Sequence, residues 1–288
     1  MSDDGALSIS DGRHPVIEVL REGNYIPNSL QLDNKQRQLM ILTGPNMGGK
    51  STYMRQTALI SVMAQSGCFV PASSARLGMV DRVFTRVGAH DDLVHGHSTF
   101  MVEMLELANI LRNATPNSLV LLDEIGRGTS TFDGLALAWA VAEQLHAGKG
   151  VKTLFATHYH QLTDVSKILD KSVNCHMQAK EDGHELTLMH RVAEGPTDAS
   201  FGIHVAKMAG VPEEVLERAR KVLNNLEEGS TIEVSKAGPV QSVFSTDFGG
   251  RTETKQNPVV DEIKKMDLMN LTPLQALEKL HEIQQKLL

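Results

Sequence analysis

A glycine-rich segment lies between a short apolar run and a helical pattern, and it reads Gly44-Pro45-Asn46-Met47-Gly48-Gly49-Lys50-Ser51. It fits the spacing G-x-x-x-x-G-K-[ST], in which glycines let backbone N–H groups approach phosphate oxygens. The helix that follows presents its positive N-terminal end to the anion. Lys50 is expected to neutralise the β- and γ-phosphates, and Ser51 to bind Mg²⁺ through its hydroxyl. The alternative is a glycine-rich turn with a chance lysine.

Two adjacent carboxylates, Asp123 and Glu124, follow the apolar run 119–122. An acidic residue at the end of a buried strand is costly unless it meets a cation. Asp123 is therefore expected to hold Mg²⁺ and its waters, and Glu124 to polarise the attacking water. Taken alone, the pair could equally be a solvated strand end. The phosphate loop upstream favours the catalytic interpretation.

His158 follows a third apolar run, 153–157. Strand exits in open parallel sheets line the ligand crevice, so a histidine there could hydrogen-bond to the γ-phosphate or to the attacking water. It is one of 12 histidines in the chain, and a structural role is an equal alternative. The other histidines are interpreted as structural.

Short apolar runs alternate with longer helical patterns along the first part of the chain, which is typical of a sheet with crossover helices. We predict buried strands at 39–42, 119–122 and 153–157, and helices at 50–67, at 101–111 and from Asp133. Alternation at Val173, Cys175 and Met177, a turn at 181–183 and a return at 185–188 predict a hairpin on the sheet's edge. The predicted class is α/β, with a mostly parallel sheet covered by helices on both faces.

The C-terminal third has a different pattern. Two short helices are predicted at Ile203–Ala209 and Glu213–Leu226, and an αα-hairpin cannot bury its apolar face alone. Between residues 229 and 260, 17 of 32 residues are Gly, Ser, Thr, Pro, Gln or Asn, which indicates a flexible linker. We divide the chain into an ATPase-type domain at 1–200, a helix-turn-helix dimerisation segment at 201–228, the linker at 229–260 and an amphipathic oligomerisation element at 261–288. The alternative for the last element is a helix that folds back on the main domain.

The composition excludes several classes of protein. The 288 residues carry a net charge of −7, which excludes a globally basic nucleic-acid coat but leaves a local basic patch open. Cys68 and Cys175 are too few for a disulfide scaffold and lack metal-site spacing, so a reducing compartment fits. No run of 18 apolar residues is present, and the acidic start at 1–4 argues against a secretory signal. We expect a cytoplasmic protein with no membrane partner.

Five segments together resemble the MutS family of DNA mismatch-repair ATPases: Thr43–Gln56, Asp123–Gly134, Gly12–Glu18, Ser98–Glu103 and Ala156–Leu162. The resemblance covers nearly the whole chain, and 229–260 is its least informative part. It corresponds to the C-terminal portion of the family's architecture, so the mismatch-reading, connector and lever regions are expected N-terminal to Met1. The resemblance implies a P-loop fold of ABC-ATPase type, ATP and Mg²⁺ as cofactors, and two composite sites in a head-to-tail dimer.

The resemblance also implies roles for single residues. Gly44 to Ser51, with Thr52, would bind the triphosphate, while Asp123 would serve Mg²⁺, Glu124 would act on the water, and His158 would be the switch histidine. Ser98 matches the signature loop, which acts in trans on the γ-phosphate of the opposite subunit; an ordinary helix cap is the alternative. Tyr25 matches an aromatic that stacks on adenine, with a buried core tyrosine as the alternative. Arg127 and the segment 129–133 resemble the lining of the dimer seam.

Two sequence patterns that would indicate other activities are not found in the chain. The transporter signature Leu-Ser-Gly-Gly-Gln is missing, and no mismatch-wedge Phe-x-Glu element can be assigned. The expected function is ATP hydrolysis that, in the complete protein, couples to binding of mismatched double-stranded DNA. Expected partners are a second copy of the chain, a tetramer through the C-terminal element, and a downstream mismatch-repair factor. The alternatives are a nucleotide-dependent assembly module with little hydrolysis and, more weakly, a small-molecule kinase.

Overall fold

The computed structural model describes Ser2, residues 4–22, 24–86, 98–182, 185–197 and 201–227, and Lys279. The chain divides into two compact units, Met1–Val222 and Leu223–Leu288. The linker predicted at 229–260 lies outside the described residues, and so does the element predicted at 261–288 apart from Lys279. The two proposed roles of these segments therefore stay predictions.

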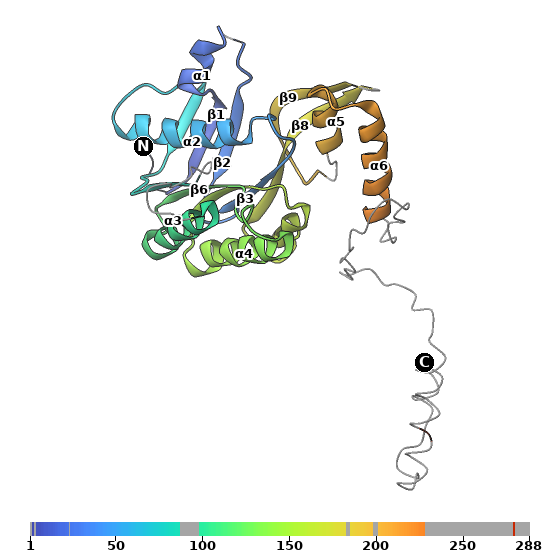
Figure 1. Cartoon of the computed structure of the whole chain (residues 1–288). Helices are drawn as coiled ribbons and strands as arrows, with labels where there is room; N and C mark the ends of the chain where they lie inside the picture. Colours follow the sequence, from blue (N-terminus) through green and yellow to red (C-terminus); the bar gives the residue numbers. More distant parts are fainter. Residues whose placement is uncertain are drawn as a thin grey trace. The chain divides into compact units, whose positions relative to one another are not determined.

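A six-stranded sheet forms the centre of the first unit, with the strand order β5-β6-β7-β3-β8-β9. The strands are β3 (Leu39–Thr43), β5 (Val83–Arg86), β6 (Leu119–Asp123), β7 (Lys152–Ala156), β8 (Ser172–Asp182) and β9 (Glu185–Glu194). Every neighbouring pair is parallel except β8 and β9, which form an antiparallel hairpin at one edge (Figure 1). The predicted parallel sheet and edge hairpin are thus confirmed.

Side chains on the two faces of this sheet enter two separate clusters. In β3, Met40 and Leu42 join one cluster, which also contains Tyr53 of α2 (Lys50–Gln65). Leu39 and Ile41, which alternate with them, join the other cluster together with residues of α3 (Thr99–Asn113) and α4 (Thr131–Glu143). Helices therefore cover both faces of the sheet, as predicted. In agreement with this, β3 is buried along its whole length.

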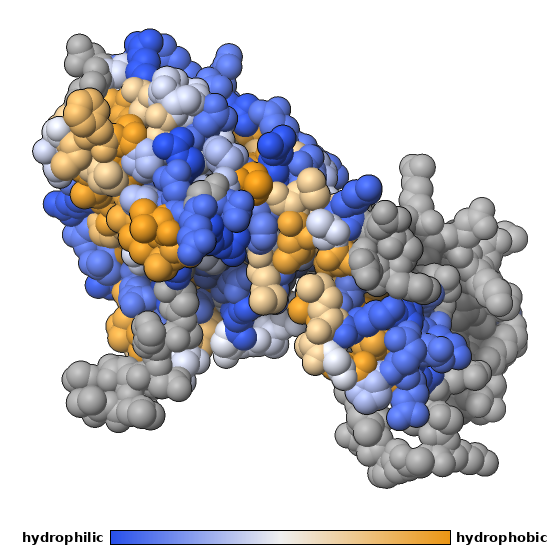
Figure 2. Space-filling model, turned by 90° about the horizontal axis from the view of Figure 1, so that it is seen from above, coloured by the Kyte–Doolittle hydropathy of each residue, from blue (hydrophilic) through white to orange (hydrophobic). Residues whose placement is uncertain are grey.

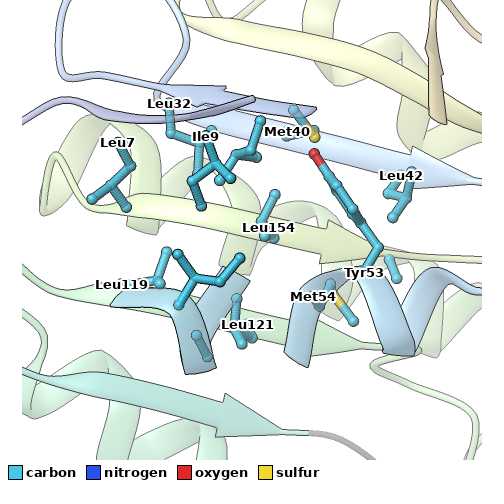
Figure 3. Packing of buried hydrophobic residues seen from close by; sticks show 14 of the residues in the cluster. Leu7, Ile9, Leu32, Met40, Leu42, Tyr53, Met54, Leu119, Leu121 and Leu154 are labelled. Carbon is cyan, nitrogen blue, oxygen red and sulfur yellow. The ribbon is translucent and has the colours of Figure 1, made fainter. Parts of the chain in front are cut away.

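A second, three-stranded sheet covers the α2 side and is not predicted by the apolar runs. Its strands are β1 (Leu7–Gly12), β2 (Asn28–Leu32) and β4 (Ser74–Leu77), in the antiparallel order β2-β1-β4. Figure 3 shows Leu7, Ile9 and Leu32 of this sheet gathered with Met40 and Leu154 of the larger sheet. The strands of this smaller sheet therefore contribute to one of the two core clusters.

The remaining described helices differ in length, from 6 residues in α1 to 15 in α6. They are α1 (Pro15–Leu20), α5 (Gly202–Met208) and α6 (Glu213–Glu227), with a π-helical turn at Gln144–Gly148 and a 3₁₀ helix at His160–Lys167. The predicted pair at 203–209 and 213–226 is thus found within about one residue of its bounds, and α5 contacts β9. On the surface seen in Figure 2, apolar side chains are scattered among hydrophilic ones. Within the described residues, no helix has the length and apolarity needed to cross a membrane.

Candidate active site

The predicted site residues begin where three neighbouring strands end. In the sheet, Leu42 of β3 and Asp123 of β6 are both paired with Ala156 of β7. The carboxyl ends of these parallel strands are therefore level, and the glycine-rich segment, Glu124 and His158 leave the sheet side by side. Such an edge is where open α/β sheets bind their ligands.

The glycine-rich segment 44–49 has a backbone that needs its glycines. Gly44 and Gly49 have φ angles of +128° and +106°. A Cβ on Gly48 would lie 2.9 Å from the carbonyl oxygen of Pro45. Gly49 is the N-cap of α2 and makes no side-chain capping bond, so the first N–H groups of α2 are left to a ligand. The side chains of Asn46 and Met47 are exposed at the outer part of the loop.

Lys50 is folded back onto this loop. Its Nζ donates hydrogen bonds to the carbonyl oxygens of Gly44 at 2.9 Å and Pro45 at 3.2 Å. It also lies 3.9 Å from Oε1 of Glu124, and only 4% of its side chain is exposed. Burial lowers the pKa of Lys50, and the carboxylates of Glu124 and Asp123 oppose that change. The ammonium is thus held at the mouth of the loop by groups that favour its charged form.

Ser51 and Asp123 are joined by a hydrogen bond from the serine hydroxyl to Oδ2 of the carboxylate. The other oxygen, Oδ1, is buried and has no hydrogen-bond partner among the residues that the structure describes. Burial raises the pKa of Asp123, and Glu124 adds to the rise, whereas the bond from Ser51 lowers it. A free carboxylate oxygen beside a hydroxyl is a donor set that suits Mg²⁺, which usually takes one or two carboxylates and completes its shell with phosphate oxygens and water.

The described part of the chain holds no group of three or more His, Cys, Asp or Glu side chains that could bind a metal ion by itself. Ser51 and Asp123 offer one hydroxyl and one carboxylate, and Mg²⁺ usually completes such a set with phosphate oxygens and water.

Glu124 lies at the centre of a charged cluster. Its carboxylate is hydrogen-bonded to Nε2 of His158 and lies 2.6 Å from Nη1 of Arg127. Burial alone would raise the pKa of Glu124, but His158, Arg127 and Lys50 together lower it below its ordinary value. These neighbours therefore favour the ionised form of Glu124, which is the form that can accept a proton.

The backbone of Glu124 is unusual. Its φ angle is +59°, in the left-handed region that L-residues other than glycine rarely adopt. Its N–H donates to the carbonyl oxygen of Ala156 at 2.9 Å, which fixes the first residue after β6 against the end of β7. Non-glycine residues in such conformations persist where the surroundings hold them, and they are concentrated at functional sites.

Ser98 is the N-cap of α3. Its hydroxyl accepts a hydrogen bond from the backbone N–H of Met101 at 3.2 Å, and the residue is exposed. The hydrogen bonds of Ser98 found in the described residues stay within its own helix. The structure therefore does not bring Ser98 to the Lys50–Glu124 cluster of the same chain, and the helix-cap alternative remains open beside a role in trans.

Tyr25 lines a small cavity of about 80 Å³ beside the glycine-rich segment. Met47, Gly49 and Thr52 line it from the phosphate loop and the start of α2, and His190 from β9. Tyr25 is half-buried, and its hydroxyl donates to Oε1 of Gln56 at 2.8 Å. Burial raises the pKa of its phenol. The cavity thus places the aromatic ring of Tyr25 next to the phosphate loop.

His190 belongs to this cavity and is not predicted from the sequence. Its Nδ1–H donates to the carbonyl oxygen of Gly48 at 3.1 Å, and its φ angle is +49°. Its own carbonyl oxygen accepts from Nδ2 of Asn28 at 2.9 Å. As one of 12 histidines, inside an alternating strand pattern, it carries no signal that distinguishes it in the sequence.

Comparison with known proteins identifies the family. The model of MutS domain V matches residues 40–227. The DNA mismatch repair protein MutS of Methanosarcina mazei is 51% identical over 306 aligned residues, which cover 100% of this chain and 34% of that protein. The corresponding protein of Caldicellulosiruptor bescii is 48% identical over 289 residues, covering 98% of this chain and 33% of the relative. The chain thus spans about a third of the length of these relatives, and it belongs to the MutS family.

Proposed function

We propose that this chain binds ATP together with Mg²⁺ and hydrolyses it to ADP and phosphate. The observation that carries the proposal is the meeting of two pairs at level strand ends: Ser51 with Asp123, and Glu124 with His158. One pair suits a metal ion and the other suits an attacking water. Membership in the MutS family supports the same activity.

The residues divide the work as follows. The N–H groups of the 44–49 loop and the ammonium of Lys50 hold the phosphate tail, and Tyr25 with His190 encloses the base. Glu124 accepts a proton from water as the water oxygen bonds to the γ-phosphorus, and the bond to the bridging oxygen of ADP breaks. His158 orients Glu124 through their hydrogen bond. Mg²⁺, held by Ser51 and Asp123 when bound, would neutralise charge on the β- and γ-phosphate oxygens.

We further propose an ABC-type composite site that two copies of the chain complete. Ser98 and Ser130 each cap the exposed start of a helix, α3 and α4, and the positive end of such a helix suits the charge on a transferred phosphoryl group. Ser98 would act on the nucleotide of the second copy, and Arg127 with the segment 129–133 would line the seam. A higher-order assembly through residues 261–288 is part of the same proposal.

The longer relatives of this chain are named DNA mismatch repair protein MutS. We propose that ATP binding and hydrolysis here control how the complete protein binds mismatched double-stranded DNA and a downstream repair factor. We also propose a cytoplasmic location, since both cysteines are free, with Cys68 exposed and Cys175 buried, as is usual in a reducing compartment.

One observation favours a second function, a nucleotide-dependent assembly module with little hydrolysis. Arg127 lies 2.6 Å from Glu124, and together with His158 and Lys50 it neutralises the carboxylate that would act on water. In this alternative ATP would drive dimerisation, and the phosphate would leave only slowly. Steady-state phosphate release separates the two functions.

Complementation in a mixed dimer tests the composite site directly. Ser98→Ala and Lys50→Ala would each be inactive alone, since each lacks one half of every site. An equimolar mixture should recover about a quarter of the wild-type rate, because random pairing makes about half of the dimers mixed, each with one intact site. A mixture that is no more active than its components contradicts a site shared between subunits. A rate of phosphate release per mole of wild-type protein that does not change with dilution would also contradict a shared site.

A further inference from the structure

The backbone of Gly126 is held by hydrogen bonds from two elements that are distant in sequence, one at its N–H and one at its carbonyl oxygen. Its N–H donates to Oε1 of Glu103 in α3 at 2.6 Å. Its carbonyl oxygen accepts from the hydroxyl of Tyr159, the residue after His158, at 3.1 Å. Gly126 follows Glu124 by two residues, so these two hydrogen bonds fix the turn that carries the proposed catalytic carboxylate.

The turn also has no space in which to shift. Gly126 has a φ angle of +91°, and a Cβ there would lie 2.6 Å from Cα of Gly134 in α4. A Cβ on Gly134 would in turn lie 2.3 Å from the Tyr159 hydroxyl. Helix α4 and Tyr159 therefore close around Gly126, while Glu103 holds its N–H from α3.

Glu103 is unusual for an acidic residue, since only 7% of its side chain is exposed. Its Oε2 lies 3.6 Å from Nη2 of Arg86, whose side chain is also only 7% exposed. A buried carboxylate beside a guanidinium is a strong acceptor for a backbone N–H. Arg86 supplies the opposite charge that burial of Glu103 requires.

We propose that Glu103 is a positioning residue for Glu124. It acts through the Gly126 peptide group and keeps the carboxylate of Glu124 within reach of His158 and Lys50. The proposal rests on the proposed ATPase function. Ser98, which is proposed to act on the nucleotide of the second copy, caps the same helix α3 that carries Glu103. Helix α3 therefore connects Ser98 with the turn that carries Glu124, which is proposed to act on the nucleotide of its own chain.

The experiment compares five variants of the full chain by phosphate release and by nucleotide affinity. Glu103→Ala removes the acceptor and should lower kcat about 10- to 100-fold, since small misplacements of a catalytic group have effects of that size. ATP affinity should stay within about twofold, because the hydrogen bond and ion pair of Glu103 found in the described residues go to Gly126 and Arg86. Glu103→Gln keeps a carbonyl oxygen for the Gly126 N–H and should recover most of kcat.

Glu106→Ala is the matched control. Glu106 lies one turn further along α3 and its Oε2 is 3.0 Å from Nε of Arg86, but 49% of its side chain is exposed. Removing it takes an ion pair from Arg86 without touching Gly126, so kcat should stay at the wild-type value. An equal loss in Glu106→Ala and Glu103→Ala would mean that Arg86, and not the Gly126 contact, is responsible, and would overturn the proposal.

Tyr159→Phe tests the hydrogen bond at the carbonyl oxygen of Gly126, in the next peptide group, and covers the case in which Glu103→Ala does not fold. It removes only the hydroxyl donor to Gly126 and should lower kcat about threefold or more with ATP affinity unchanged. Normal kcat in both Tyr159→Phe and Glu103→Gln, with an unfolded Glu103→Ala, would reduce Glu103 to a structural role and overturn the proposal.

Glu124→Gln, measured in parallel, separates the two levels of inference. If Glu124→Gln turns over normally, the proposed function itself fails. If Glu124→Gln is inactive while Glu103→Ala and Tyr159→Phe have wild-type kcat, only the positioning role fails.

Discussion

The carboxylate of Glu124 and Nε2 of His158 are hydrogen-bonded across the ends of two adjacent parallel strands, β6 and β7. Neither side chain belongs to a strand, so their contact depends on the level strand ends and on the bond from the Glu124 N–H to the Ala156 carbonyl oxygen. The backbone at the ends of β6 and β7 therefore brings the two side chains together.

Replacing Glu124 with Gln should leave ATP binding intact and lower hydrolysis by about 10²-fold or more, the usual contribution of a general base. The amide keeps the shape of the side chain but cannot take a proton from water. Steady-state phosphate release and an equilibrium titration with ATP measure the two effects. Glu106→Gln, on the surface of α3, is the control, and near-normal turnover in Glu124→Gln would remove this residue from the mechanism.

Asp123→Asn should make the magnesium-free protein more stable near neutral pH while it abolishes magnesium-dependent hydrolysis. The pKa of Asp123 is raised in the folded protein, chiefly by burial, so the folded state binds this proton more tightly than the unfolded state does. The ionised carboxylate therefore destabilises the fold above its folded pKa, and that cost disappears as the pH falls through the folded pKa towards the unfolded one.

Thermal unfolding of Asp123→Asn and wild type, with and without Mg²⁺ and nucleotide, measures this exchange of stability for function. The gain in Tm should be present at pH 7 and shrink as the pH is lowered. A lower Tm for the metal-free variant at pH 7 contradicts the burial argument. Full stabilisation of the variant by magnesium nucleotide contradicts the metal site.

Gly126→Ala should destabilise the protein and lower turnover much more than Gly195→Ala does. The two glycines have nearly the same φ angle, +91° and +94°, so the conformational cost of a Cβ is shared. A Cβ on Gly195 meets nothing within 4 Å, whereas one on Gly126 meets the backbone of Gly134. The difference in Tm and in kcat between the variants measures the close contact alone, and equal effects would exclude it.

Tyr25→Ala should weaken ATP binding about tenfold, since stacking on a base contributes about 1–3 kcal/mol. Tyr25→Phe keeps the ring and loses only the hydrogen bond to Gln56, so its affinity should stay within about twofold of wild type. Inorganic tripolyphosphate, which has no base, serves as the control ligand. If Tyr25→Ala weakens tripolyphosphate as much as ATP, the ring supports the loop and does not contact the base.

The predictable part of the fold is the part with unbroken apolar runs. Strands β3, β6 and β7 are buried on both faces, so each contains a run of three or four apolar residues. Strand β2 exposes every second residue and β1 leaves polar residues partly exposed between its apolar ones. Each of the two offers only two apolar side chains, a pattern too short to distinguish from a loop. The sequence therefore indicates the central sheet but not the smaller sheet that completes its core.

The candidate site is divided in the same way. Lys50, Ser51, Asp123 and Glu124 are predictable because their spacing from strands and glycines is fixed by local geometry. Glu103 and His190 are not, because each acts on a backbone group 23 or 142 residues away in sequence, and only the folded chain brings those groups together. The role of Ser98 stays a prediction, since the structure describes a single copy of the chain.

The cavity beside the phosphate loop takes Tyr25 from a segment before β3 and His190 from β9. It exists only when early and late segments of the first unit are folded together. A fragment beginning at β3 would keep the phosphate loop and Glu124, yet its cavity would lack Tyr25. A nucleotide that occupies the cavity would stabilise the contact between the N-terminal segment and the edge hairpin against unfolding.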